Sequence, residues 1–330
     1  MERIKKLFQA TDMTVGEPWK QIVLFTIPML IGNIAQQLYN TVDSIVVGRY
    51  VGDNALAAVG SAGPILNLLL VLFVGISMGA SIMVAQYFGA KERENLSYTI
   101  GNCIFLTAAA SLIIMLLAAV AVRPLLILLK TPDSILEWCY SYLMILFLGC
   151  VGSAYYNILS GILRGLGDAF SALVYLLVST VLNIVLDILF VAKFGMGVSG
   201  VALATIIAQA VSAVLCMIRL AKMTDIFDLK PVYIKPHKEF VANIVKLGLP
   251  SGLTQAIFSM AMIIVQSLTN SFGEAFIAAN VIVMRVDGFA MLPNFSFGTA
   301  MTTYAGQNVG AKAYDRVNKG AKQGTLIAVF

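Results

Sequence analysis

Long apolar runs constrain this chain more than any other feature of its sequence. Short polar connections separate eight of them, and a ninth begins near Gly320 and continues to Phe330. Each of the eight can cross a bilayer, whose hydrocarbon core of about 30 Å requires roughly 20 apolar residues in a helix. They cover approximately residues 19–44, 54–86, 98–121, 135–162, 169–192, 199–220, 241–271 and 275–307. The pattern predicts an all-α polytopic membrane protein.

Charge is too scarce for a soluble protein. Only 12% of the 330 residues are charged and 59% are hydrophobic, whereas soluble domains carry about 25% charged residues. This excludes soluble enzymes, nucleic-acid-binding proteins and disordered chains. The lone His237 and four scattered cysteines have no metal-ligand spacing, so we expect no cofactor and no resident metal. The GxGxxG pattern at 195–200 lies between two apolar runs rather than after a strand, so it predicts a tight turn.

Lysine and arginine residues indicate the orientation of the helices in the membrane. If the N-terminus is cytoplasmic, 17 of the 22 basic residues flank the spans on that side, 4 lie on the outer side, and Arg285 lies inside a span. Cytoplasmic flanks carry an excess of basic residues. We therefore expect a cytoplasmic N-terminus and a multi-pass plasma-membrane protein.

The sequence contains an internal repeat. Segments 51–58 and 86–91 resemble 272–279 and 307–312, both at an offset of 221 residues. An even number of helices per copy gives both copies the same orientation, which is a transporter architecture with substrate handled between the halves. We expect a first six-helix lobe over 1–220, a cytoplasmic linker over 221–240, and the start of a second lobe over 241–330.

The second copy is shorter than the first. Two copies at this offset would need about 442 residues, roughly 110 more than are present. We therefore expect an incomplete second lobe with two helices and part of a third, about 8.5 helices in all. The chain is then either a fragment or a natural truncation of a longer transporter, and we do not expect it to transport alone.

Polar residues line one face of the first and fifth spans. Intramembrane acids are costly and usually functional, and both stripes end in an aspartate. Spacings of three or four residues place side chains on one helix face, and Thr205 of the sixth span lies at a similar depth. Burial and like charge both oppose ionisation of a carboxyl group, so such acids can couple proton flow to transport, or can be satisfied structural hydrogen-bonding groups. The stripes are Asn33, Gln36, Asn40 and Asp43, and Tyr175, Ser179, Asn183 and Asp187.

The seventh and eighth spans carry further polar and sulfur-containing residues. Arg285 and Asp287 are expected either to form an intramembrane ion pair or to find separate partners. Methionine is flexible and polarizable, which suits a site for varied apolar ligands, although simple packing is an equally natural role. The candidates for the substrate cavity in these spans are Gln255, Met284, Arg285, Asp287 and Met291.

The chain resembles the multidrug and toxic compound extrusion (MATE) family along its whole length. The resemblance rests on the Pro28 region and on segments 39–43, 51–60 and 86–91. It also rests on the pattern Leu159…Gly161…Arg164-Gly165…Gly167-Asp168 and on Asn183…Asp187. The eighth span, with Arg285…Asp287…Leu292-Pro293, is most similar to the bacterial branch of DinF- and MepA-type exporters.

The resemblance implies a two-lobe, twelve-helix antiporter that expels cationic, often aromatic drugs in exchange for protons or sodium. It implies a cation site in the first lobe formed by Asp43, Asn183, Asp187 and Thr205. Some members carry a glutamate in the seventh helix, where this chain has Gln255 and Phe258, so coupling is expected in the first lobe. The partners are then small amphipathic cations and the lipid bilayer, with no nucleic acid, and the protein is expected to be a monomer.

Two other functions are compatible with a protein of this kind. A flippase for a lipid-linked saccharide would favour a more cationic cavity than one with several acids and a single Arg285. A membrane-embedded enzyme would need a nucleophile–base pair or metal ligands within the spans, and the sequence shows neither. The expected function is therefore a cation-coupled antiporter and not an enzyme.

Overall fold

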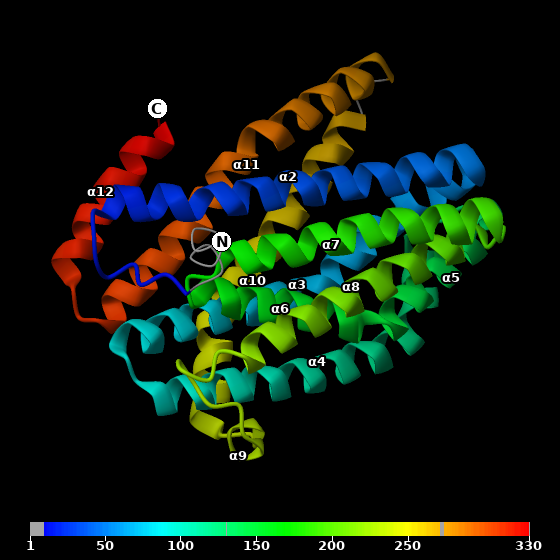
Figure 1. Ribbon diagram of the computed structural model, residues 1–330. Helices are drawn as coiled ribbons and strands as arrows, with labels where there is room; N and C mark the ends of the chain where they lie inside the picture. Colours follow the sequence, from blue (N-terminus) through cyan, green and yellow to red (C-terminus); the bar gives the residue numbers. More distant parts are fainter. Residues whose placement is uncertain (1–9, 130, 271–273, 330) are drawn as a thin grey trace.

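The computed structural model describes residues 10–129, 131–270 and 274–329, and all of their regular structure is helical (Figure 1). One element, η1, is a π-helix that continues α7 without a break. The elements are α2 (Pro18–Tyr50), α3 (Asp53–Ala90), α4 (Arg93–Leu128), α5 (Asp133–Leu148), α6 (Cys150–Gly165), α7 (Ala169–Asp187), η1 (Ile188–Lys193), α8 (Gly197–Ala221), α9 (Pro231–Ile234), α10 (Lys238–Asn270), α11 (Glu274–Gly310) and α12 (Tyr314–Val329). The expected all-α class is confirmed.

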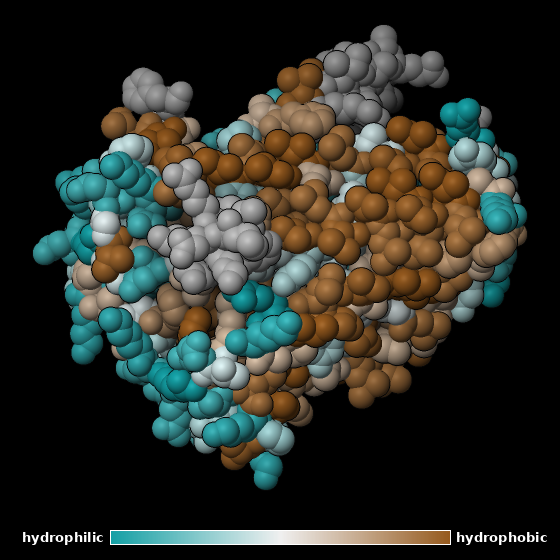
Figure 2. Space-filling view, in the orientation of Figure 1, coloured by the Kyte–Doolittle hydropathy of each residue, from teal (hydrophilic) through white to brown (hydrophobic). Residues whose placement is uncertain are grey.

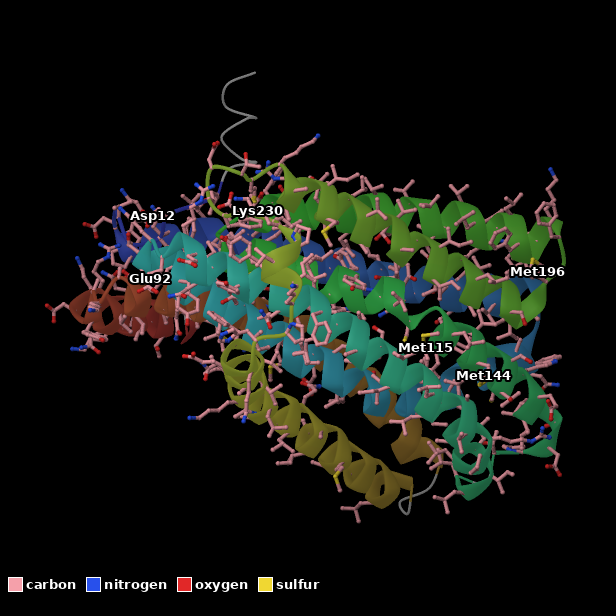
Figure 3. The ribbon with its side chains drawn as sticks, turned by 90° about the horizontal axis from the view of Figure 1, so that it is seen from below. Asp12, Glu92, Met115, Met144, Met196 and Lys230 are labelled. Atoms are coloured by element: carbon pink, nitrogen blue, oxygen red, sulfur yellow. The ribbon has the colours of Figure 1, made fainter. Side chains whose placement is uncertain are left out.

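The helices lie side by side in a bundle with two chemically different ends. Asp12, Glu92 and Lys230 lie at one end, hereafter the charged end, and Met196 lies at the opposite end, hereafter the far end (Figure 3). Between them the surface is a broad apolar band (Figure 2). Leu112, Leu116 and Val120 of α4, for example, are 58%, 63% and 77% exposed. A soluble protein does not expose large apolar side chains in such density, whereas a lipid-facing helix requires them.

Six of the expected spans have the length and hydropathy of membrane-crossing helices. Among the described residues, α2, the second half of α3, α4, α7 with η1, and α8 meet these criteria singly. The sixth is α5 with α6, which are bent by 53°. All six belong to the expected first lobe, although the division of the chain into lobes at 220 and 240 stays a prediction.

Two expected helix boundaries were wrong. The run 135–162 is not one straight helix, because α5 ends at Leu148 and α6 begins at Cys150. A Cβ on Gly149 would lie 2.6 Å from side-chain atoms of Ile206, so the bend occurs where α8 packs against this part of the chain. The ninth helix begins at Tyr314 rather than near Gly320, because its first two turns are amphipathic rather than apolar.

The two copies of the repeat cross at the charged end with matching geometry. A Cβ on Gly89 of α3 would collide with the carbonyl oxygen of Gln307, and a Cβ on Gly310 of α11 would collide with that of Gln86. Glycine is needed at both positions because the two backbones touch. The residues that end α3 and α11, Lys91 and Lys312, both adopt left-handed conformations, with φ of 58° and 56°. These equivalent positions are all 221 residues apart.

Residues 10–17, which precede α2, form hydrogen bonds with the helices at the charged end. Met13 is fully buried, and its backbone N–H donates to Gln307 Oε1 at 2.8 Å. Gln307 Nε2 donates to the carbonyl oxygen of Gly165 at 3.1 Å, and Arg316 donates to the carbonyl oxygens of Met13 and Gly16 at 3.2 and 3.0 Å. The segment therefore connects α6 to α11 and α12 and holds this end of the bundle together.

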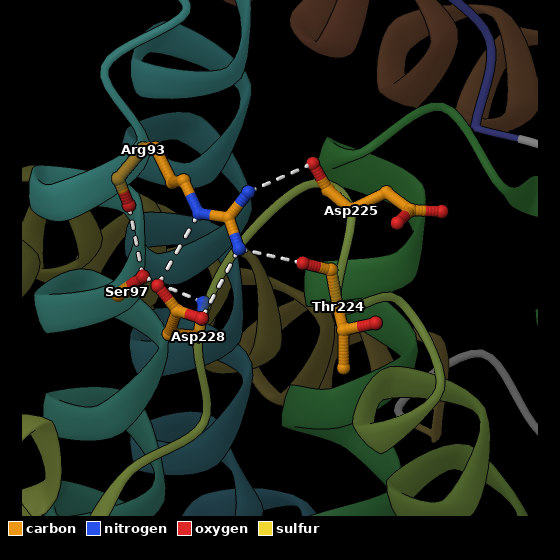
Figure 4. A network of polar contacts seen from close by, with 5 residues as sticks. All are labelled: Arg93, Ser97, Thr224, Asp225 and Asp228. Carbon is orange, nitrogen blue, oxygen red and sulfur yellow. Dashed lines mark hydrogen bonds and ion pairs between the residues drawn. The ribbon is translucent and has the colours of Figure 1, made fainter.

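The linker between α8 and α10 packs on the start of α4 (Figure 4). Arg93 Nε and Nη2 donate to the two carboxylate oxygens of Asp228 at 3.2 and 3.1 Å. The same guanidinium donates to the carbonyl oxygens of Thr224 and Asp225, and Asp228 N–H donates to Ser97 Oγ at 2.9 Å. The Arg93 side chain thus holds three linker residues against α4.

Candidate cation site

Three helices of the first repeat bring their polar stripes together near the far end. Asn183 and Asp187 are fully buried on α7 and are four residues apart, so they share a face. With the amide nitrogen of Asn183 turned toward the acids, Nδ2 lies 2.8 Å from Asp43 Oδ1 on α2 and 3.2 Å from Asp187 Oδ2. A single amide therefore donates to two carboxyl groups from different helices.

The third helix joins the site through Thr205 of α8. Tyr39 lies one turn before Asp43 on α2, and its hydroxyl donates to Thr205 Oγ1 at 3.2 Å. Tyr39 is 5% exposed, so this bond is shielded from solvent. The structure thus places Asp43, Asn183 and Asp187 together and connects Thr205 to α2 through Tyr39. The stripe on α2 omits Tyr39, although this residue belongs to the same face as Asp43.

Several buried oxygens around the site have no hydrogen-bond partner in the described part of the chain. They are Asp187 Oδ1, Ser179 Oγ one turn from Asn183, and Gln209 Oε1 one turn from Thr205. Buried polar atoms are nearly always paired, so orphaned ones indicate a bound ion, a proton or water. Oxygen atoms from a carboxylate, a hydroxyl and an amide fit a hard cation such as sodium as well as a proton.

The position of Asp187 along its helix follows from the length of α7. Asp187 ends α7, 18 residues after Ala169, which corresponds to about 27 Å along the helix axis. The π-helix η1 begins at the next residue, Ile188. Short π-helical segments are rare and occur frequently at functional sites. No pattern in the sequence marked this distortion, since Ile188–Lys193 continues the apolar run of α7.

The remaining residues of the stripes do not contact the acids. Asn40 is exposed on α2, and Gln36 is partly buried there. On α7 the backbone carbonyl of Tyr175 accepts a hydrogen bond from Ser212 Oγ at 2.7 Å, which ties α7 to α8. Ser179 is 2% exposed and lies between this bond and Asn183. The cation site therefore comprises only the last part of each stripe.

The candidates in the second repeat lie on exposed faces. Gln255, Asp287 and Met291 are exposed on α10 and α11, and Asn294 Nδ2 lies 3.7 Å from Met291 Sδ. The side chains of Met284 and Arg285 lie outside the described residues, so the ion pair expected between Arg285 and Asp287 stays a prediction. Among the described residues no cluster of three or more His, Cys, Asp or Glu side chains could hold a metal ion.

Comparison with known proteins decides the family. The sequence matches the MatE family over residues 28–189 and 250–330. The chain belongs to the MatE family. This match includes Asp43, Asn183 and Asp187 as well as the repeat of the first two helices.

MatE relatives include named drug-resistance proteins. The probable multidrug resistance proteins YpnP and YoeA of Bacillus subtilis are 32% and 30% identical over 311 and 308 residues. These matches cover 94% and 91% of this chain, and 69% and 66% of the relatives. The multidrug export protein MepA of Staphylococcus saprophyticus is 25% identical, over 83% of this chain and 61% of its own length. The chain thus spans about two thirds of these relatives, which are named as resistance or export proteins rather than enzymes.

Solved MatE structures have the same fold. An outward-facing multidrug resistance MATE family transporter of the MOP superfamily superposes with a TM-score of 0.90 at 29% identity, covering 97% of this chain and 71% of that one. A MOP superfamily transporter from Pyrococcus furiosus gives the same score and identity. The two-lobe helical architecture of MatE proteins is therefore the architecture of this chain, as the resemblance implied.

Proposed function

We propose that the chain is part of a cation-coupled exporter of organic, cationic compounds that works by alternating access. The observation that carries this proposal is the contact of one buried amide, that of Asn183, with the carboxyl groups of Asp43 and Asp187. Two carboxylates in a medium of low dielectric repel each other and lose their hydration. A proton or a sodium ion that binds between them removes both costs.

Binding of the cation disfavours binding of the organic substrate, and this effect is transmitted through α2. Asp43 lies on this helix, and on the same helix Asn33 Nδ2 donates to Ser296 Oγ of α11 at 2.9 Å. Binding of a cation at Asp43 thus acts on a helix that also holds the contact between the two repeats. Release of that contact and closure of the far end would convert one access state into the other.

The substrate is proposed to bind between the repeats, against α2, α3, α10 and α11. The exposed Asp287 and the amides of Gln255 and Asn40 offer negative charge and hydrogen-bond acceptors to a cation. Met291 is 50% exposed, and a flexible thioether adapts to apolar rings of different shape. These features suit amphipathic cations rather than one specific ligand.

The charged end is proposed to face the cytoplasm of a bacterial cell. The linker and the ends of α3 and α11 lie there and carry most of the basic residues, as cytoplasmic flanks do. The site at Asp43 and Asp187 then lies in the outer half of the membrane. We also propose that the protein acts as a monomer.

Dye efflux tests this function. The exporter of which this chain is part is reconstituted into liposomes, and efflux of an ethidium-like dye is followed under a proton gradient or a sodium gradient applied separately. Asp187→Asn should abolish gradient-driven transport, whereas Asp133→Asn, at an exposed position in the first turn of α5, should leave it unchanged. Transport by the Asp187→Asn protein at the wild-type rate would contradict the proposal.

A further inference from the structure

A second polar site lies at the charged end, separate from the acids. Arg164, the penultimate residue of α6, lines a cavity of about 60 Å³ between α2, α6 and α7. Tyr156 of α6 and Asn33 of α2 line the same cavity, and Met29, Leu173 and Leu176 form its apolar walls. A cavity needs about 10–15 Å³ to hold one water molecule, so this one has room for the polar head of a larger molecule.

The guanidinium of Arg164 has no carboxylate partner in the part of the chain that the structure describes. Its Nη1 donates there to Ser160 Oγ at 3.3 Å. Asp168, four residues further along, is already occupied, because it accepts from Ser171 N–H and hydroxyl and pairs with Arg219 at 2.9 Å. A guanidinium has five N–H donors, and Arg164 therefore faces the cavity with most of them available.

A largely buried charge without a partner destabilises a fold. The position of Arg164 beside a cavity therefore indicates a ligand of opposite charge. Arginine recognises carboxylates and phosphates through paired N–H donors. The Tyr156 hydroxyl and the Asn33 amide can add hydrogen bonds to the same oxygens. The apolar walls formed by α2 and α7 would contact the hydrocarbon part of such a molecule.

We infer that this cavity binds the carboxylate or phosphate group of an amphipathic molecule, with Arg164 as the principal anion-binding residue. The inference does not depend on the proposed transport, because it concerns binding alone and involves none of the residues of the cation site. The cavity lies close to a contact between the two repeats. Asn33, which lines the cavity, also donates to Ser296 across the contact between α2 and α11, so an anion bound here lies beside that contact.

A matched pair of dyes tests the inference. A rhodamine with a free carboxylate and its methyl ester differ only in the acid, and their binding to the purified protein is measured by fluorescence anisotropy. We expect Arg164→Gln to weaken binding of the acid by about tenfold or more, the loss expected for a hydrogen-bonded charge, and to leave binding of the ester unchanged. Arg164→Lys should retain part of the affinity, and Arg49→Gln, at an exposed arginine of α2, should change neither dye.

Competition experiments identify the source of the oxyanion. Displacement of the acid dye by inorganic phosphate, or by phosphatidylglycerol in nanodiscs but not phosphatidylcholine, would support the site and distinguish a free anion from a lipid head group. Tyr156→Phe, which keeps the ring, should weaken binding of the acid dye alone if Arg164→Gln proves unstable. The inference is overturned if Arg164→Gln and Tyr156→Phe bind both dyes as the wild type does, or if they lose affinity for both equally.

Discussion

Asn183 is the residue that joins the two acids of the cation site. Its amide is the donor shared by Asp43 and Asp187, and its side chain is fully buried. Leucine has a similar size but no donor. Asn183→Leu should lower the free energy of unfolding by about 1–3 kcal/mol, the cost of leaving buried acceptors unpaired.

Thermal unfolding of the purified protein measures this loss. Asn67→Leu is a suitable control, because Asn67 is exposed on α3 and should tolerate the change. An Asn183→Leu protein as stable as the wild type at neutral pH would show that the amide does not hold the carboxyl groups together.

Helical periodicity in the sequence was sufficient to find the residues of the site on α2 and α7. Asp43, Asn183 and Asp187 lie on polar faces of apolar helices, so their spacing in the sequence is enough to identify them. Tyr39 was not singled out, because an aromatic residue does not stand out in an apolar helix and its bond to Thr205 depends on packing between α2 and α8. Arg164 entered only as a basic flank and as part of the family pattern, since its lack of a carboxylate partner is a property of the fold.

At the scale of elements, the crossing of α3 and α11 depends on glycine at two equivalent positions. Gly89→Ala and Gly310→Ala should each destabilise the protein, by about 1–3 kcal/mol, because the added methyl group meets a backbone carbonyl that cannot rotate away. Each change should also loosen the charged end, which thermal unfolding and cysteine accessibility there can measure.

The same two helices provide matched controls. Gly60 of α3 and Gly298 of α11 have no atom within 4 Å of an added Cβ. Gly60→Ala and Gly298→Ala should therefore be neutral or stabilise by up to about 1 kcal/mol through helix propensity. Equal losses at all four glycines would mean that the backbone contact has no special role.

The linker should detach from α4 at acid pH. Hydrogen bonding and charge from Arg93 lower the pKa of Asp228. A carboxylate whose pKa is lowered in the folded state stabilises that state above its unfolded pKa of about 3.9 and loses this effect as the pH falls further. Hydrogen exchange at the Asp228 amide, which donates to Ser97, should accelerate below about pH 4 after correction for the intrinsic rate.

Two variants distinguish loss of the Arg93–Asp228 contact from other effects of acid. Asp228→Asn should exchange faster at neutral pH and lose the acid-induced change. Asp225→Asn should behave as the wild type, since Asp225 contributes its backbone carbonyl to Arg93. If amide exchange still accelerates at acid pH in Asp228→Asn, a group other than Asp228 causes the acceleration.

Distortions of the helices could not be predicted from hydropathy. The break at Gly149 lies in a run that is apolar on both sides, and a Cβ there would meet Ile206 on α8. The π-helix after Asp187 has an equally ordinary sequence. Packing between helices is not visible in hydropathy, whereas the apolar runs and the repeat were read directly from the sequence.

For the whole molecule, α2 carries both the cation site and a contact between the repeats. Asp43 lies toward the far end of α2 and Asn33, which donates to Ser296 of α11, lies near its middle, about 15 Å away along the helix axis. A cation that binds at one point of a helix and a contact that opens at another point of it suit alternating access. The anion site at Arg164 lies next to that contact.

The most direct test of the cation site is whether substrate binding expels the coupling ion. A cationic dye is added to purified protein in weakly buffered solution, and released protons are counted with a pH indicator, or released sodium with a sodium electrode. The wild type and Asp133→Asn should release a cation on binding dye, and Asp187→Asn should bind dye without release. Equal release from Asp187→Asn and the wild type would contradict the assignment of Asp43, Asn183 and Asp187 as the coupling site.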